Sequence, residues 1–300
     1  MESGSAVWAE VAALLLPEGL AALLQGTSPQ GDVPKLLLVP DSYLWRVPWA
    51  ALRVEPGHPE GHLADRSVLT MLPSLSLLAD FPDPEVGGSS PQPPRAPEGR
   101  TVAYLSGVHP DGLALERQAL GAAYGADVSF ADRLADLLTA LAPDRVPPSM
   151  VVASVHGNNR PGLAHALHLD RTTWLSAARM LTLRFPPVLM INACLSAELD
   201  ERRGTDPLGI PTVALCRGAE TVIGGIYPLP DGPSRVPGRG DHPTARILTI
   251  LYRLLAEGMA PSSALRAAQR QWRREQGPVP VLLWAGLVSM TTRFDDSPHA

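Results

Sequence analysis

The stretch VVASVHG, from Val151 to Gly157, is an apolar run that stops abruptly at a histidine and a glycine. The stretch PVLMINACLS, at positions 187–196, repeats the pattern and stops at Ala193-Cys194. Short continuous apolar runs of this kind are typical of strands that are buried on both faces of a parallel sheet. Ligands bind beyond the carboxyl ends of such strands, so both ends indicate a functional site.

Strands and helices alternate on either side of these two runs. Between the runs lies one stretch long enough for the crossover that parallel neighbours require. The pattern predicts an α/β fold with a mostly parallel sheet flanked by helices. Apolar runs predict strands at 35–40, 44–52, 67–72, 100–107, 127–131, 149–157, 187–196, 220–229 and 282–290. Helical periodicity predicts helices at 6–24, 73–80, 113–125, 132–142, 171–183, 206–219, 244–258 and 262–275.

A proline- and glycine-rich stretch divides the chain. Positions 82–99 have no periodicity and are dense in Pro, Gly and Ser, which is typical of a linker. We therefore expect a smaller N-terminal α/β subdomain with this linker over 1–95, and a larger subdomain over 96–300.

Composition excludes several function classes. A net charge of -5 gives no reason to expect direct binding to nucleic acid or to a membrane surface. The apolar N-terminal stretch at 6–24 carries Glu10, Pro17 and Glu18 and lacks the pattern of a signal peptide. Two cysteines are too few for a disulfide framework, which favours a reducing, cytoplasmic location.

The two strand ends carry residues that suit nucleophilic catalysis. If the strands are neighbours, His156 and Cys194 face each other across one spacing of about 4.8 Å. A thiolate is a strong nucleophile, and a nearby imidazole can accept its proton and later protonate a leaving amine. The N–H groups of Gly157 and Cys194 could then form an oxyanion hole. From the residues alone, a buried structural cysteine and a turn histidine stay open as the alternative.

The other candidate residues give weaker evidence of a functional role. His165 and His168 lie three apart in an expected strand, on opposite faces, so we expect no metal site. Cys216 is expected in the core. Glu198, with Asp200 and Glu201 beside it, is expected in a solvated loop, with substrate steering as the second reading. The glycine patterns of nucleotide- and dinucleotide-binding loops do not occur, and no cofactor is expected.

Several motifs together resemble the CHAT-domain family of prokaryotic caspase-like cysteine peptidases, which are relatives of caspases and separase. The resemblance covers nearly the whole chain in the expected order. It implies a caspase-like sheet, with a degenerate N-terminal caspase-like subdomain over 1–95 and a catalytic subdomain over 96–300. It also implies a catalytic dyad of His156 and Cys194. The motifs are LLLVPDSYLWRVPWAAL at 36–52, LPSLSLL at 72–78, SVHG at 154–157, NACLS at 192–196, DPLGIPTVALCRGAETVIGGIYPLPD at 206–231 and WAGLV at 284–288.

The chain departs from the family pattern at three positions near the cysteine. Ala197 stands where many members have glycine, and Tyr227 where tryptophan is common. Asn192 stands where some arginine-specific caspase relatives carry an acid. In separase-like relatives an acid at the position of Asp231 looks like the receptor for a basic P1 side chain. Asp231 and Asn192 are therefore the predicted substrate-binding residues, with a basic P1 preference.

The resemblance implies a cysteine endopeptidase that cleaves a partner protein in bacterial defence, including antiphage defence, or in programmed cell death. It also implies an upstream sensor or activator protein. Two alternatives stay open: a catalytically inactive interaction module on the same fold, and a small-molecule hydrolase with the same dyad. The Pro- and Gly-rich stretch at 229–243 is expected to be a flexible loop beside the site.

Overall fold

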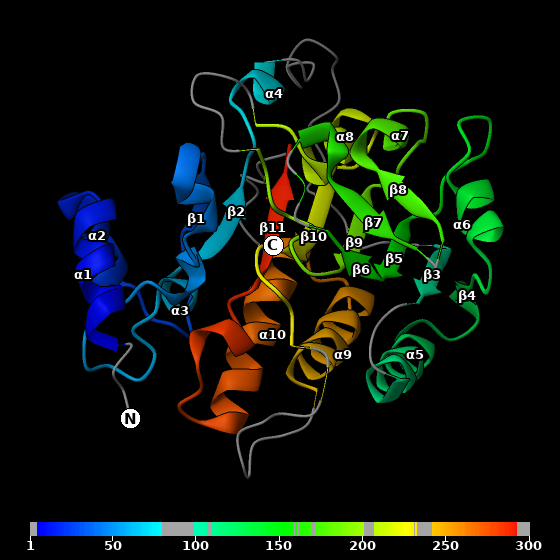
Figure 1. The fold of residues 1–300 in the computed structure, drawn as a ribbon. Coiled ribbons are helices and arrows are strands. Elements are labelled where there is room, and N and C mark those ends of the chain that lie inside the picture. Colours follow the sequence, from blue (N-terminus) through cyan, green and yellow to red (C-terminus); the bar gives the residue numbers. More distant parts are fainter. Residues whose placement is uncertain are drawn as a thin grey trace, which may run out of the picture.

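A computed structural model gives the fold and describes residues 5–79, 99–106, 110–158, 160, 162–169, 172–200, 207–230, 232 and 242–292. One eight-stranded sheet crosses the molecule, with helices on both faces (Figure 1). Its order is β1-β2-β11-β10-β9-β5-β3-β4, and all pairings are parallel except that of β10 with β11. The predicted fold class is confirmed. The strands are β1 (Lys35–Leu38), β2 (Val68–Met71), β3 (Thr101–Leu105), β4 (Val128–Phe130), β5 (Met150–Ser154), β9 (Val188–Asn192), β10 (Thr221–Gly225) and β11 (Leu287–Thr291).

Two apolar layers hold the helices against the sheet. Successive residues of a strand point to opposite faces, so Val151 packs in one layer and Val152 in the other. Helices α6, α7 and α8 contribute to the first layer, and α5, α9 and α10 to the second. The helices are α1 (Ser5–Leu15), α2 (Glu18–Gly26), α3 (Leu63–Arg66), α4 (Ser76–Ala79), α5 (Pro110–Tyr124), α6 (Leu134–Ala140), α7 (Ala177–Met180), α8 (Ile210–Cys216), α9 (Pro243–Ala256) and α10 (Pro261–Gln276).

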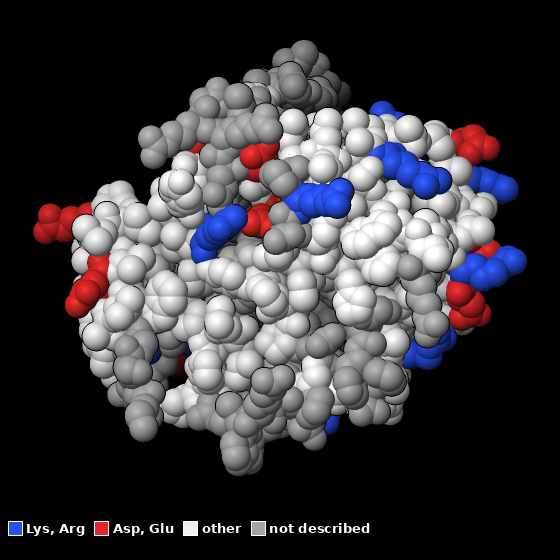
Figure 2. All heavy atoms as spheres, viewed as in Figure 1, with Lys and Arg blue, Asp and Glu red and all other residues white. Residues whose placement is uncertain are grey.

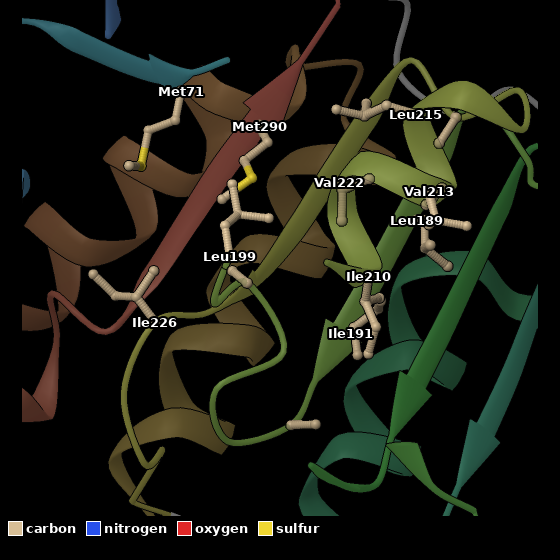
Figure 3. Packing of buried hydrophobic residues seen from close by; sticks show 14 of the residues in the cluster. Met71, Leu189, Ile191, Leu199, Ile210, Val213, Leu215, Val222, Ile226 and Met290 are labelled. Atoms are coloured by element: carbon tan, nitrogen blue, oxygen red, sulfur yellow. The ribbon is translucent and has the colours of Figure 1, made fainter. Parts of the chain in front are cut away.

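The N-terminal strands extend the same sheet. β2 joins β11 through the pair Met71 and Met290, whose side chains lie in the buried layer shown in Figure 3. Asp65 of α3 is fully buried and pairs with Arg270 (3.2 Å) and Arg273 of α10. Burial alone would raise the pKa of Asp65, but hydrogen bonding with His62 and the charge of Arg273 hold this pKa well below its usual range. These ion pairs fasten the N-terminal segment to the C-terminal helix.

Two predicted elements are wrong in type. The expected strand at 44–52 is two short 3-10 helices, η1 (Ser42–Arg46) and η2 (Trp49–Ala51). Pro48 lies between them and has no backbone N–H to donate to a neighbouring strand. The segment is closed within itself, because the Trp49 indole N–H donates to the Leu44 carbonyl (3.0 Å).

The expected helix at 171–183 is a strand, β8 (Trp174–Ser176), followed by the single-turn helix α7. The Ser176 hydroxyl accepts the Arg179 N–H (3.3 Å) and starts the helix late. β8 belongs to a small second sheet with β6 (His156–Gly157) and β7 (Ala166–His168), in the order β6-β7-β8. The sequence pattern predicted no second sheet.

Charge is dispersed over the surface. On the face shown in Figure 2, basic and acidic side chains are interspersed among uncharged ones. Within the described ranges, no helix is long and apolar enough to cross a bilayer. Residues 80–98, which hold most of the predicted linker, and residues 231 and 233–241 of the predicted loop lie outside the described residues.

Candidate active site

The two strands that carry the predicted dyad lie side by side. β5 pairs in parallel with β9, and Ser154 at the end of β5 lies opposite Asn192 at the end of β9. The chain continues two residues beyond each strand, to His156 and to Cys194. The prediction that both residues follow neighbouring strand ends is therefore confirmed.

His156 and Cys194 line the same hollow, whose empty volume is about 440 Å³ with the open solvent at its mouth included. Helices α5 and α9 and the segment after β10 form its walls. His156 is exposed and Cys194 is partly buried, so a ligand in the hollow can reach both. The lining residues are Gly112, Glu116, Val155, His156, Asn192, Ala193, Cys194, Leu229, Thr244, Ala245 and Leu248.

A main-chain donor fixes the sulfur of Cys194. The N–H of Leu229, four residues after the end of β10, donates to Cys194 Sγ at 3.3 Å. Leu229 also lines the hollow. The bond therefore holds the thiol at the wall of the hollow and ties it to the segment that follows β10.

The turn after Cys194 has an unusual backbone conformation. Leu195 has φ = 59°, in the left-handed region that costs a non-glycine residue about 1–3 kcal/mol. Its N–H donates to the Tyr227 carbonyl at 3.2 Å. This sharp turn makes the chain leave β9 immediately after Cys194.

A buried serine holds this turn in place. The Ser196 hydroxyl donates to the Ile191 carbonyl (2.8 Å) and accepts the Gly225 N–H (2.9 Å), so it bridges β9 and β10. Leu199 after the turn and Ile226 after β10 enter the same apolar layer (Figure 3). The turn that follows Cys194 is thus rigidly supported.

Gly157 lies directly against the backbone of Cys194. A Cβ added at Gly157 would lie 2.0 Å from the Cys194 carbonyl oxygen, so only glycine fits. The next residue, Asn158, donates its N–H to Ala166 of the facing strand (3.1 Å). Because antiparallel residues exchange hydrogen bonds only at alternate positions, the Gly157 N–H points away from that strand. This orientation fits the predicted oxyanion donor.

Asn192 is buried at the inner end of the hollow. Its Nδ2 donates to Glu116 Oε1 (2.7 Å), Ser154 Oγ (3.0 Å) and Tyr252 Oη (2.8 Å). Burial raises the pKa of Glu116, and the hydrogen bonds from Ser154, Tyr252 and Asn192 only partly offset this effect. Sequence reasoning missed Glu116, because one glutamate in an amphipathic helix gives no sign of burial.

The two histidines considered for metal binding have separate roles. Burial lowers the pKa of His165 to about 4, although the main-chain carbonyls of Glu198 and Leu195 favour its charged form. His168 stacks on Trp174, with ring centroids 4.2 Å apart. Among the residues with assigned positions, no three His, Cys, Asp or Glu side chains are grouped to hold a metal ion.

The acidic loop after Cys194 contacts the N-terminal segment. Glu198 pairs with Arg46 of η1 at 2.8 Å, and the Tyr227 hydroxyl donates to the Arg46 carbonyl. The expectation of a purely solvated loop is therefore wrong for Glu198. Glu201 lies outside the described residues.

Two further predicted positions have different outcomes. Cys216 is exposed at the end of α8, so the prediction that it is a core residue is wrong. The helix ends at Cys216 and turns it away from the layer that holds Leu215. Asp231 lies outside the described residues, and its predicted substrate-binding role stays a prediction.

A profile of the CHAT domain matches residues 5–292. The chain belongs to the CHAT-domain family. A search of curated proteins found no match for this CHAT domain. Its fold is caspase-like and similar to that of solved cysteine proteases.

Three solved structures illustrate this similarity. Separase in the Saccharomyces cerevisiae separase–securin complex superposes with a TM-score of 0.58 at 15% identity, over 87% of this chain and 15% of that one. The Arg-specific cysteine proteinase gingipain R gives 0.55 at 11%, over 94% and 69%. The complex of Porphyromonas gingivalis RgpB pro- and mature domains gives 0.56 at 10%, over 94% and 70%. The CHAT domain thus spans a small part of separase and about two thirds of the gingipain chains.

Proposed function

We propose that this CHAT domain is a cysteine endopeptidase with Cys194 as nucleophile and His156 as general base and acid. The observation that carries the proposal is the pairing of β5 with β9, which leaves both residues two positions beyond facing strand ends and on one hollow. Partial exposure of Cys194 makes the thiol accessible, unlike a cysteine that only fills a core.

The first half of the reaction forms an acyl-enzyme. His156 takes the thiol proton, and the Cys194 sulfur attacks the scissile carbonyl carbon. The carbonyl oxygen becomes an oxyanion that accepts the N–H groups of Gly157 and Cys194. As the C–N bond breaks, His156 returns its proton to the leaving amine, and a thioester on Cys194 remains.

The second half of the reaction hydrolyses this thioester. His156 accepts a proton from water, whose oxygen attacks the thioester carbonyl, and the same two N–H groups receive the oxyanion again. The C–S bond breaks, Cys194 regains its proton, and the carboxylic acid product leaves. The rigid turn through Leu195 and Ser196 supports this step by keeping the sulfur in place.

Asn192 and Asp231 are the proposed substrate-binding residues. The Nδ2 of Asn192 is already engaged by three acceptors, so this residue would meet substrate through its Oδ1. We further propose a cytoplasmic partner protein as substrate and a separate sensor or activator, in bacterial defence or programmed cell death. Family membership and the caspase-like fold support these points.

An electrophilic peptide tests the dyad directly. The exposed Cys216 would give background labelling, so the reference protein is Cys216→Ala. Intact mass should show one adduct on this protein, none after the further change Cys194→Ala, and strongly slowed labelling after His156→Ala. If His156→Ala is labelled as fast as the reference protein, the result would instead favour an inactive interaction module.

A further inference from the structure

A buried acid lies in the hollow beside the dyad and has no part in the reaction steps above. Glu116 of α5 is 3% exposed and Asn192 is 4% exposed, yet both line the hollow with Cys194. An acid is rarely buried without a basic partner. Among the described residues, no basic side chain pairs with Glu116.

The hydrogen bonds of Glu116 leave part of its carboxylate unused. Within the described part of the chain, all of them reach Oε1: from Ser154 Oγ (2.6 Å), from Asn192 Nδ2 (2.7 Å) and from the Tyr252 hydroxyl. Oε2 receives none of these bonds. The Oδ1 of Asn192 is also buried without a donor among the described residues. Two neighbouring residues thus offer unfilled acceptors in one hollow.

Unfilled buried acceptors and an unpaired acid favour the same kind of ligand. Guanidinium and ammonium groups carry only donors and a positive charge, so they supply both missing features. The apolar walls suit their aliphatic stems, because Leu229, Ala245 and Leu248 line the hollow. A neutral amide would bring donors but leave the acid unpaired.

We propose that Glu116 and Asn192 together receive the basic side chain of the substrate residue before the scissile bond, arginine or lysine. The proposal rests on the proposed function, since it uses the same hollow as the dyad. It makes Glu116 a specificity-determining residue independent of Asp231. Ser154 and Tyr252 position it by holding Oε1 and leaving the second oxygen to the ligand.

Binding to an inactive protein separates this proposal from the proposed function. Two peptides differ only at P1, with arginine in one and citrulline, its neutral isostere, in the other. Calorimetry on Cys194→Ala should show the arginine peptide binding about 30-fold more tightly, as a buried charge-assisted pair implies. Equal affinities would overturn the role of Glu116 and leave the dyad untouched. If Cys194→Ala prefers the arginine peptide but the wild-type protein cleaves neither peptide, only the proposed peptidase activity is overturned.

Three variants in the Cys194→Ala background locate the receptor. Glu116→Gln keeps the shape and removes the charge, so the arginine-to-citrulline ratio should fall to about 3-fold or less. Tyr252→Phe removes one bond to Oε1 and keeps the acid, so the ratio should fall much less than in Glu116→Gln. If these hydrogen bonds have only a structural role, each variant should bind both peptides more weakly, and by the same factor.

Asp231→Asn is the third variant and should lower the ratio less than Glu116→Gln does. If the ratio collapses in Asp231→Asn and persists in Glu116→Gln, Asp231 is the receptor and the proposal is wrong. If Glu116→Gln does not fold by circular dichroism, the comparison of the two peptides on Cys194→Ala and on Asp231→Asn still decides.

Discussion

Gly157 touches the backbone of Cys194: a Cβ at Gly157 would lie 2.0 Å from the Cys194 carbonyl oxygen. Gly157 follows His156 directly, so this contact joins the two chain segments that carry the proposed dyad. A side chain there would push the segments apart by a distance comparable to the tolerance of a catalytic hydrogen bond. The glycine therefore sets the separation between the histidine and the cysteine.

Replacing this glycine should strongly reduce activity. Gly157→Ala should lower kcat/KM by about 100-fold or more, because an error of about 1 Å in catalytic geometry has an effect of this size. Peptide cleavage by the purified variant is the measurement. If Gly157→Ala cleaves the peptide at the wild-type rate, the contact does not set the catalytic geometry.

A second glycine gives a matched control. Gly121 lies inside α5, and a Cβ added there meets no atom within 4 Å. Alanine in a helix interior is favoured over glycine by about 0.5–1 kcal/mol. Gly121→Ala should therefore keep full activity and slightly raise the melting temperature.

The dyad should behave as one unit. Cys194→Ala and His156→Ala should each reduce cleavage by about 10³-fold or more, and the double variant should be no slower than the slower single variant. Both residues lie beyond the central strands β5 and β9, so circular dichroism should stay unchanged. If the fold-reduction in cleavage by the double variant equals the product of those of the two single variants, the two residues act independently.

The positions of His156 and Cys194 at neighbouring strand ends could be predicted from the sequence, because the apolar runs before them are long and end abruptly. Parallel strands place their carboxyl ends at one edge, so two such ends can be placed together without knowledge of side-chain packing. The sequence also predicted that a glycine at position 157 lets a substrate carbonyl approach its N–H, but it did not predict the contact with Cys194. That a Cβ would strike Cys194 depends on the exact register of the two segments.

Other features depend on tertiary contacts that local patterns do not contain. Glu116 lies among helix-forming residues like a surface glutamate, and only the fold brings Ser154, Asn192 and Tyr252 to it. The stretch around Trp174 has the periodicity of a helix, but pairing with β7 makes it a strand. Tertiary pairing overrides local propensity in such short segments.

The turn that presents the nucleophile should depend on Ser196. Ser196→Ala removes two buried hydrogen bonds and leaves the Gly225 N–H without its acceptor, at a cost of about 1–3 kcal/mol. Chemical denaturation measures this loss, and kcat should fall as the turn loosens. Ser129→Ala removes only one long hydrogen bond (3.3 Å) from an exposed residue to the Thr101 carbonyl, so it should change stability by less than about 0.5 kcal/mol. Equal effects of the two changes would contradict the role of Ser196.

Binding of a basic peptide should release protons. Burial holds the pKa of Glu116 above its usual value in the free protein, and a bound cation would lower it again. In mildly acidic solution the arginine peptide should therefore show heats that depend on the ionisation enthalpy of the buffer. The citrulline peptide should show no such dependence. Identical buffer dependence for both peptides would argue against a cation at Glu116.

The buried imidazole of His165 should make the fold sensitive to acid. Burial lowers the pKa of His165 to about 4, whereas an unfolded histidine titrates near 6.5. The unfolded chain therefore binds the proton more readily. The contribution to stability is complete above pH 6.5 and is lost as the pH falls towards 4, by up to about 3 kcal/mol.

Replacement of His165 should remove this acid sensitivity. His165→Gln keeps a polar side chain beside the carbonyls of Glu198 and Leu195 but does not titrate, so its unfolding free energy should fall less between pH 6.5 and 4.5 than that of the wild type. His156→Gln, at an exposed histidine, is the control and should keep the wild-type slope. Urea unfolding at several pH values gives all three slopes. If His165→Gln and the wild type have the same slope, another group causes the acid sensitivity, and the ring of His165 does not stay neutral in the folded protein.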